Sequence, residues 1–356
     1  MVNKITLLLV IGGACLYSCT TNTNSVVCER IAVPLDKIEP VNITNDLCDN
    51  IVVLENSKDA FMSSIIYVDA ADGILLVSSG DKILTFDKSG RYIRQIGDQG
   101  NASNEYVSFG DVFVRDGRVN IFDNSRKRLL QFSLTGEYIQ GREFDTKDPV
   151  ADVFPTDQGQ YVCKPTFQGG GSRHIPEFEL YGSNFKRLRK SGNILAPGIK
   201  PRVELFQYAP DSLYYWKILR DTIFSVDMEM NVGPRYFIDF GKFSIPRSVR
   251  NDHPDIIDLI TYLNANGSSY ASVIQHVVEK DDTIAFTFAF DGKCLVAVID
   301  KKDKSKCRVL DITLTERNLS IEPYLGVCND EFVLVGIDND NMNENYTLVF
   351  LKSLNL

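Results

Sequence analysis

Short apolar runs separated by polar turns recur along the chain, and the clearest set lies at residues 74–97. Three runs occur there, ILLVSS, KILTF and RYIRQI, and the turns between them contain the letters GD and DKSG. Strands of about five residues joined by turns rich in Gly, Asp and Ser are typical of an antiparallel meander. The pattern predicts three consecutive antiparallel strands in this stretch.

The same phrase returns at residues 115–140 as RDGRVNIFDNSRKRLLQFSLTGEYIQ. Gly73 aligns with Gly117 at an offset of 44 residues, and Gly90 aligns with Gly136 at an offset of 46 residues. A four-stranded unit that repeats every ~40–50 residues is the sequence signature of a propeller blade. The repeat therefore predicts a fold made of consecutive blades.

Six segments of this kind account for nearly the whole chain. They predict an all-β fold, a six-bladed β-propeller of four-stranded antiparallel blades. The last apolar run, TLVFLK, is expected to pair with a strand near the N-terminus, at 30–33 or 51–54. Closing the ring in this way removes an exposed sheet edge.

One stretch breaks the strand pattern. The letters HPDIIDLITYLNANG place Ile256, Leu259, Ile260 and Leu263 near helical spacing, with a proline before the run and a glycine after it. Proline and glycine are frequent at the start and the end of a helix, respectively. A short helical insertion is therefore predicted around residues 254–266.

The N-terminal segment differs from the rest of the chain. Lys4 is its only charge, and the apolar run that follows is too short to span a bilayer, as expected of a secretory signal peptide. The letters LYSC, ending at Cys19, resemble a bacterial lipobox. The expected organisation is a lipoprotein signal peptide (1–18), a lipidated tether (19–27) and a propeller domain (28–356). The alternative is an ordinary cleaved signal and a soluble periplasmic product.

Charge limits the partners of the mature protein. Without the signal peptide the chain has 37 basic and 47 acidic residues, and therefore a net charge of −10. An acidic surface argues against nucleic acids and anionic membrane surfaces as partners. We therefore expect the protein to meet the outer membrane of the bacterial cell envelope only through its lipid, facing the periplasm or the exterior. We also expect a monomer.

Three features of the sequence are shared with one known family. The first is IRQIGDQGNASNEY at residues 93–106, the second is RDTIFSVD followed by PRYFIDFGKFSIP, and the third is the placement of the lipobox and the helical insertion. In these features the chain resembles the six-bladed β-propeller lipoproteins of Bacteroidota, relatives of the NHL-repeat propellers, although the letters ASN stand where that family usually has a Gly-Pro-Gly core. The resemblance covers residues 27–356 and implies the fold and export. It implies no activity, because most members have none established.

Catalysis or metal binding would need a constellation of side chains that the sequence does not present. The three histidines, His174, His253 and His276, have no partner at the spacing of a metal pair, and we interpret each as structural. No nucleophile elbow, phosphate-binding loop or CxxC pair occurs. We predict no catalytic residues, no metal ligands and no cofactor.

The loop at residues 98–106 is the best binding candidate because it is long for a blade connection and rich in amide side chains. Amides that both donate and accept hydrogen bonds, next to an aromatic ring that can stack on a sugar, suit the recognition of a glycan or peptide. The alternative is that the last two residues of the loop only fix the junction between blades. The predicted ligand contacts are Gln99, Asn101, Asn104, Glu105 and Tyr106.

Two classes of function remain. The favoured class is a non-enzymatic binding or scaffolding module for a glycan, a peptide or an envelope protein. The alternative is an NHL-like propeller hydrolase or lyase with a divalent metal in the central channel; His and carboxylate residues recurring at one position in successive blades would favour it, and we identify no such register. Asp-Ser/Thr-aliphatic triplets also make Ser212, Thr222 and Thr283 candidate sites of O-glycosylation, although each lies where a turn enters a predicted strand.

Overall fold

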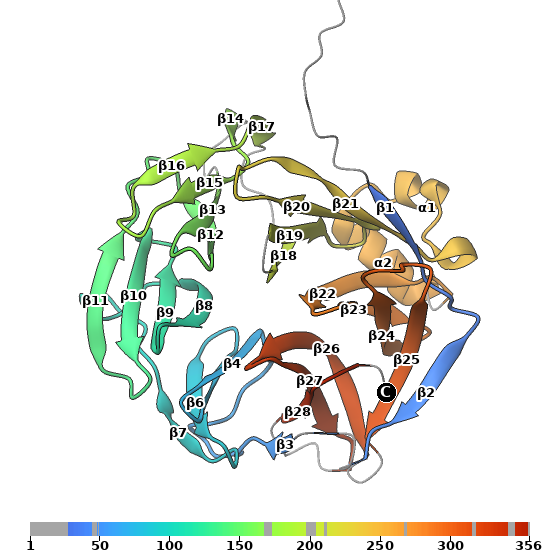
Figure 1. The fold of residues 1–356 in the computed structure, drawn as a ribbon, viewed down its shortest axis with the longest axis horizontal. Helices are drawn as coiled ribbons and strands as arrows, with labels where there is room; N and C mark the ends of the chain where they lie inside the picture. Colours follow the sequence, from blue (N-terminus) through green and yellow to red (C-terminus); the bar gives the residue numbers. More distant parts are fainter. Residues whose placement is uncertain are drawn as a thin grey trace, which may run out of the picture.

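The computed structural model describes residues 28–44, 48, 50–166, 173–196, 204–209, 212–266, 269–314, 318–340 and 346–354. The predicted signal peptide, Cys19 and the tether lie outside the described residues. Within them, mostly antiparallel sheets stand side by side in a ring around a common centre (Figure 1). This is the arrangement of a β-propeller, so the predicted all-β propeller is confirmed.

Three sheets have four strands each and follow one another along the chain. The first contains β4 (Tyr67–Ala71), β5 (Ile74–Ser78), β6 (Ile83–Asp87) and β7 (Tyr92–Gln95). The second contains β8 (Phe109–Arg115), β9 (Arg118–Asp123), β10 (Arg128–Ser133) and β11 (Tyr138–Glu143). The third contains β12 (Val150–Pro155), β13 (Tyr161–Pro165), β15 (Glu179–Tyr181) and β16 (Arg187–Lys190), while β14 (Arg173–Pro176) and β17 (Asn193–Ala196) form a separate two-stranded ribbon.

The fourth sheet has five strands because the N-terminal segment joins it. Its own strands are β18 (Glu204–Ala209), β19 (Ser212–Lys217), β20 (Thr222–Val226) and β21 (Val232–Asp239). The outermost of these, β21, pairs in parallel with β1 (Glu29–Ala32). A covered edge cannot pair with another chain.

The remaining strands form one nine-stranded sheet. It contains β22 (Ser272–Lys280), β23 (Thr283–Phe290), β24 (Lys293–Asp300), β25 (Cys307–Leu314), β26 (Leu319–Cys328), β27 (Glu331–Asp338), β28 (Thr347–Leu351) and β3 (Asn50–Val53), and β2 (Ile38–Asn42) pairs in parallel with β25. The antiparallel pairing of β3 with β28 confirms the predicted closure by both ends of the chain. The prediction of six separate four-stranded blades is not met: the described residues show four separate sheets of four or five strands and this larger one.

Turn chemistry explains the repeat seen in the sequence. The hairpins β4–β5 and β8–β9 are closed by Asp72-Gly73 and Asp116-Gly117, and all four residues have φ between 50° and 79°. Two consecutive positive φ angles define the type I′ turn, which matches the twist of the flanking strands and favours Asp-Gly. Both hairpins therefore need the same two residues at the same place.

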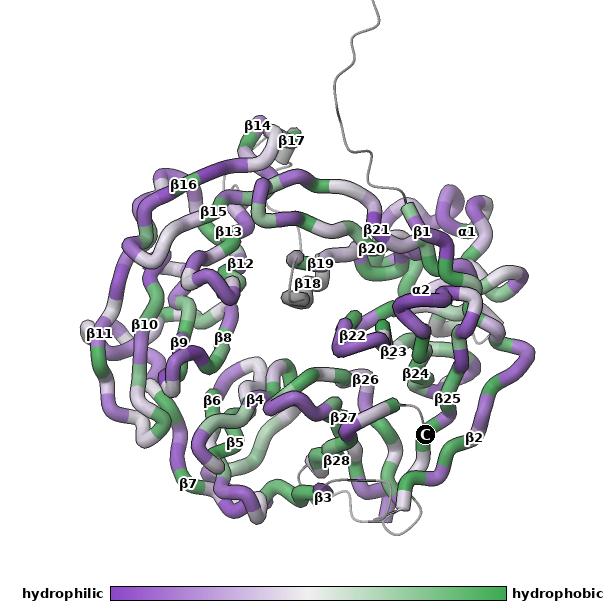
Figure 2. Tube along the Cα trace, in the orientation of Figure 1, coloured by the Kyte–Doolittle hydropathy of each residue, from purple (hydrophilic) through white to green (hydrophobic). Residues whose placement is uncertain are grey.

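Apolar side chains fill the space between successive sheets. One cluster, for example, joins Phe113 and Phe122 of the second sheet to Tyr161 and Tyr181 of the third. Similar clusters join each neighbouring pair around the ring, and one of them lies between β22–β25 and β26–β28 of the nine-stranded sheet. By contrast, the outermost strands β11 and β16 are exposed and largely hydrophilic (Figure 2). The core is therefore a set of layers between blades.

The helical insertion is larger than the sequence indicated. It comprises a short 3₁₀ helix, η1 (Gly241–Phe243), and two α-helices, α1 (Arg247–Asp252) and α2 (Ile256–Asn266). The predicted helix corresponds to α2, whose first turn is capped by the Asp255 carboxylate, which accepts hydrogen bonds from the backbone N–H groups of Ile257 and Asp258. The six residues of α1 contain no buried side chain, so the sequence has no apolar periodicity from which this helix could be predicted.

Candidate ligand-binding channel

A cavity of about 1230 Å³ lies at the centre of the ring. Its walls are formed by the innermost strands β4, β8, β12, β22 and β26 and by residues just before three of them, such as Ser108 and Pro149. This volume lies just above the ~300–1,000 Å³ that is typical of small-molecule sites. The lining contains both aromatic and polar side chains. The aromatic residues are Tyr67, Phe109, Phe113, Phe154, Trp216, His276 and Tyr324. The polar, uncharged residues include Ser78, Asn124, Ser125, Thr166 and Gln275.

Aspartates recur at one position of successive inner strands, a register that sequence reasoning missed. The third residue of β4 is Asp69, that of β8 is Asp111 and that of β12 is Asp152, at spacings of 42 and 41 residues. Asp69 accepts a hydrogen bond from the backbone N–H of Val114 in β8 at 3.3 Å, and Asp111 accepts one from Val153 in β12 at 2.7 Å. The Asp69 and Asp111 carboxylates therefore join neighbouring blades.

A tyrosine makes the equivalent contact where the ring closes. The Tyr324 hydroxyl of β26 accepts a hydrogen bond from the backbone N–H of Val68 in β4 at 2.9 Å. Tyr67 likewise directs its hydroxyl to the Asp69 carboxylate. Burial raises the pKa of Asp69, and the Tyr67 hydroxyl and two backbone N–H groups act against that rise. The polar groups of this part of the wall are thus engaged in holding the blades together.

The inner strand β22 has a different construction. The pairing of β22 with β23 shifts register twice. Ser272 pairs with Ala289, Gln275 with Thr287 and Val278 with Ala285, so each three-residue advance along β22 is matched by only two residues along β23. The strand β22 therefore contains two β-bulges. Val273 and His276 lie in these bulges with φ of 54° and 47°. A β-branched or bulky residue in the left-handed region costs of the order of 1–2 kcal/mol, which the surrounding structure must offset.

The bulges bring two consecutive polar side chains to the cavity. In a regular strand neighbouring side chains point to opposite faces, yet Gln275 and His276 both line the cavity. The His276 ring lies against Tyr324, with ring centroids 4.8 Å apart. In the part of the chain that the structure describes, no protein partner forms a hydrogen bond with the Gln275 side chain or the His276 ring nitrogens. These polar groups can therefore be offered to a ligand.

Burial keeps His276 uncharged. It lowers the pKa of the imidazole to about 4, because the charged form is disfavoured away from water. The described lining otherwise contains one acid, Asp111, and one base, Lys127, which donates a hydrogen bond to the Thr146 carbonyl. At neutral pH the described walls therefore carry no net charge.

A single tryptophan reports on this site. Trp216 of β19 is the one tryptophan of the chain, is 1% exposed and contributes to the cavity lining. Its indole N–H donates a hydrogen bond of 2.6 Å to the carbonyl of Ile274 in β22. The indole is therefore tied to the residue that precedes Gln275.

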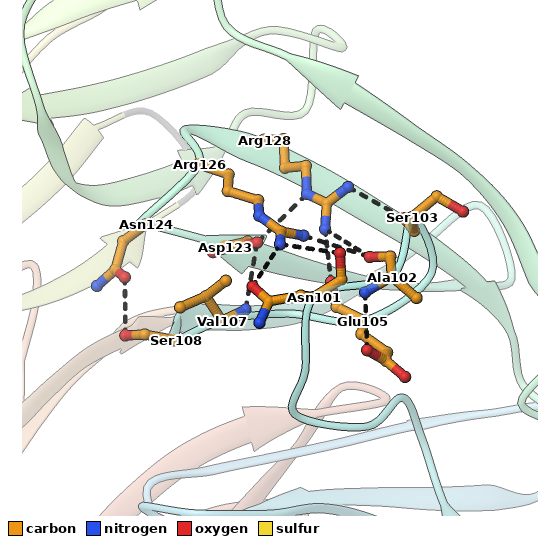
Figure 3. A network of polar contacts seen from close by, with 10 residues as sticks. All are labelled: Asn101, Ala102, Ser103, Glu105, Val107, Ser108, Asp123, Asn124, Arg126 and Arg128. Carbon is orange, nitrogen blue, oxygen red and sulfur yellow. Dashed lines mark hydrogen bonds and ion pairs between the residues drawn. The ribbon is translucent and has the colours of Figure 1, made fainter.

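The predicted binding loop, residues 98–106, is fixed by two arginines of the neighbouring hairpin (Figure 3). Arg126 donates to the side-chain and backbone oxygens of Asn101 at 2.9 and 3.0 Å. Arg128 donates to the carbonyls of Ser103 and Glu105 and contacts the fully buried carboxylate of Asp123 at 3.3 Å. The loop is therefore held as a rigid connection.

The five predicted ligand contacts lie in different environments and do not form one exposed surface. Tyr106 is 2% exposed and packs edge-on against Phe109, so the stacking role expected for it does not fit: its ring belongs to the core between two blades. The Glu105 carboxylate accepts a hydrogen bond from the backbone N–H of Ala102 inside the loop. Gln99 is exposed and donates a hydrogen bond to the Val107 carbonyl, and the fifth residue, Asn104, is also exposed.

The loop nevertheless lies beside the cavity. The turn that carries Arg126 also carries Asn124, Ser125 and Lys127, and these three residues line the cavity. The Ser108 hydroxyl, which lines the cavity too, donates to the Asn124 side chain at 2.9 Å. The loop therefore supports the rim of the site from behind.

The other candidates lie away from the cavity. Ser212, Thr222 and Thr283 are the first residues of β19, β20 and β23 and are partly buried; glycosylation at these residues stays a prediction. His174 is exposed in β14, and His253 contacts the Asp258 carboxylate at 2.9 Å. No group of three or more His, Cys, Asp or Glu side chains that could hold a metal ion occurs among the described residues.

The chain belongs to the family described as Domain of unknown function (DUF4934), whose family model matches residues 45–350. Its fold is similar to that of a Bacteroides fragilis NCTC 9343 protein named "Putative exported protein (BF0058)", at a TM-score of 0.64 and 14% identity over 91% of this chain and 100% of that one.

It is also similar to a member of the DUF4221 family from Bacteroides vulgatus ATCC 8482, at a TM-score of 0.52 and 11% identity over 85% of this chain and 96% of the other. No curated protein matches. The family model thus places the chain in a family of unknown function, and the two Bacteroides structures share its propeller fold. In the described part of the chain, no helix is both long and apolar enough to cross a membrane.

Proposed function

We propose that this protein is an exported binding module whose ligand occupies the central cavity. The observation that carries the proposal is the composition of that cavity: about 1230 Å³ lined by aromatic rings, hydroxyls and two amides, without net charge in the described walls. Apolar walls with a few polar groups that fix orientation are typical of binding sites. The contacts between inner strands hold these walls rigid, which reduces the entropic cost of binding.

We also propose that the fold has six blades. The nine-stranded sheet counts as two blades, β22–β25 and β26–β28 with β3, because an apolar cluster packs their faces against each other. Among the residues that the structure describes, only the pairs Thr313–Ser320 and Leu314–Leu319 join β25 to β26. With this division the ring has six blades, and six apolar clusters separate them.

We also propose a cellular location. The lipobox-like sequence at Cys19 supports a lipid anchor, and we place the protein as a monomer at the outer membrane. Replacement of this residue, Cys19→Ala, should move the protein from the membrane fraction to the soluble fraction or stall its processing. Unchanged fractionation would contradict the lipid anchor and leave the binding proposal standing.

A channel-blocking variant tests the site itself. Gly80 lines the cavity, and a Cβ added there meets no atom within 4 Å. Gly80→Phe should therefore fold and place a bulky ring in the opening, lowering affinity at least tenfold for any probe that binds in the cavity. Gly192→Phe is the matched control, because Gly192 has equally open surroundings and does not line the cavity.

The assay uses the emission of Trp216 during titration with neutral hexasaccharides, hexagalacturonate and a panel of uncharged hexapeptides, with calorimetry as a second readout. A probe that binds the wild type and Gly192→Phe equally, and Gly80→Phe at least tenfold more weakly, supports the proposal. A probe that binds Gly80→Phe as tightly as the wild type binds elsewhere. Binding of that kind alone, or binding of none of these probes, would refute the cavity as the ligand site.

A further inference from the structure

We propose that the ligand is an uncharged oligosaccharide, held between the polar pair Gln275–His276 on β22 and the aromatic ring of Phe109 on β8. This inference rests on the proposed function and names the ligand class of the same cavity. The inner strands β22 and β8 lie on opposite sides of the ring centre (Figure 1). All three side chains line the cavity.

The shape and chemistry of the two walls fit a sugar ring. A pyranose has an apolar face of C–H groups, which stacks on an aromatic ring, and hydroxyls at its edge, which both donate and accept hydrogen bonds. Phe109 is only partly buried, and its edge contact with Tyr106, at 5.1 Å between centroids, fixes its plane. The Gln275 amide offers two donors and an acceptor, and a neutral imidazole offers one of each.

Charge favours a neutral ligand. The described lining holds one acid and one base, and the imidazole is uncharged at neutral pH. Asp111 already accepts a backbone N–H, and the Lys127 ammonium already donates to a backbone carbonyl. An acidic or basic ligand would lose its hydration without gaining an opposite charge, which is costly.

The inner edges of the blades disfavour a peptide. A peptide that adds a strand to a sheet edge needs the backbone N–H groups of that edge. In the channel the N–H groups of Val68, Val114 and Val153 are already taken by Tyr324, Asp69 and Asp111 from the preceding blades. Recognition must therefore rely on side chains at these positions, as it does for sugars.

The bulges supply an independent reason to place the contact on β22. Left-handed backbone at a valine and a histidine is unfavourable, and such strain is found preferentially at functional sites. Its effect here is to turn Gln275 and His276 to the same side of the strand. A regular strand would have presented only one of the two.

The test titrates wild-type protein with cellohexaose, maltohexaose, xylohexaose and mannohexaose, following Trp216 emission and calorimetric heat. At least one of these should shift the emission, since Trp216 is bonded to Ile274 beside the pair. The variant Gln275→Ala/His276→Ala should lower the affinity at least tenfold. His174→Ala, an exposed histidine away from the cavity, should bind within twofold of wild type.

Gln275→Ala alone guards against a folding defect, because that side chain makes no hydrogen bond within the described structure. It should retain the wild-type unfolding midpoint and lose at least threefold in affinity. Undiminished binding of the hexasaccharide to the double variant would overturn the inference. So would loss of binding in Asn101→Ala/Asn104→Ala but not in the double variant, since it would assign recognition to the loop.

The failure of this inference is distinguishable from that of the proposed function. If hexagalacturonate or an uncharged hexapeptide binds and Gly80→Phe abolishes that binding, the cavity is the site and the ligand class is wrong. If no probe, neutral or charged, depends on Gly80, both proposals fail.

Discussion

The inner strands β8 and β22 occupy the same place in their blades and face each other across the cavity, yet the polar side chains that they direct to the cavity have opposite roles. In β8, Asp111 accepts the backbone N–H of Val153 and so joins one blade to the next. In β22, the bulged backbone presents Gln275 and His276 to the cavity without a hydrogen-bond partner in the described protein. The polar side chain of β8 stabilises the fold, whereas the two polar side chains of β22 remain able to bind a ligand.

The difference shows how to distinguish a structural polar residue from a binding residue in a propeller. Both kinds line the cavity, so position alone does not separate them. What separates them is whether the hydrogen-bonding capacity is already satisfied inside the protein. A satisfied buried group gains little from a ligand, whereas a group without a protein partner can exchange water for the ligand at a net gain of ~0.5–1.5 kcal/mol. Replacements along both strands should therefore rank by their effect on stability.

The largest loss is expected at Glu279, the satisfied acid of β22. Its carboxylate accepts hydrogen bonds of 2.6 Å from Tyr214 and Tyr236 and pairs with Lys301 at 2.7 Å. Hydrogen bonds to charged groups contribute ~1.5–3 kcal/mol, so Glu279→Gln should lower the free energy of unfolding at pH 7 by about 2–3 kcal/mol. Urea denaturation measures the loss, with the exposed Glu137→Gln as control.

The same variant has a defined pH dependence. Burial disfavours the Glu279 carboxylate, but Lys301 and the two tyrosine hydroxyls outweigh it and hold its pKa below the ordinary 4.5. The stabilisation is therefore present above about pH 4.5 and is lost as the pH falls through the lowered pKa. The difference between wild type and Glu279→Gln should shrink at pH 3. A difference that stays constant would show that the contact is not electrostatic.

An intermediate loss is expected at Asp111, which represents the structural wall. Asp111→Ala leaves the Val153 N–H without its 2.7 Å acceptor. An unsatisfied buried donor costs ~1–3 kcal/mol, and we expect a decrease of that size in urea denaturation. Asp111→Asn, whose amide oxygen still accepts, should lose clearly less. If Asp111→Ala unfolds like wild type, the carboxylate is not structural and the contrast between the walls disappears.

The smallest change at pH 7 is expected at His276. His276→Ala removes a ring contact with Tyr324 but no hydrogen bond, so we expect a loss below about 1 kcal/mol. Its pKa is about 4 in the folded protein and near the ordinary 6.5 when unfolded, so protonation destabilises wild type as the pH falls from 6.5 to 4. Over that range the variant should gain stability relative to wild type. Parallel pH profiles of the two proteins would contradict burial of an uncharged imidazole.

The sequence by itself determined the local structure. Alternating apolar runs, the Asp72-Gly73 and Asp116-Gly117 turns and the offsets of 44 and 46 residues follow from backbone geometry, which depends on neighbouring residues. The helix α2 was predicted for the same reason, since its capping residue and apolar spacing lie within one short stretch. The closing pair β3–β28 was expected because a ring must cover its last edge.

Only the tertiary structure decided which side chains face the cavity. Tyr106 looked like a surface aromatic, but the packing of two blades buries it and leaves Phe109 at the wall. The two bulges in β22 break the alternation of a strand, so its period could not show that Gln275 and His276 share a side. Asp69 and Asp111 recur in the sequence, but their partners lie on the next blade, more than 40 residues away. Long-range packing sets these directions, and a local pattern does not contain that information.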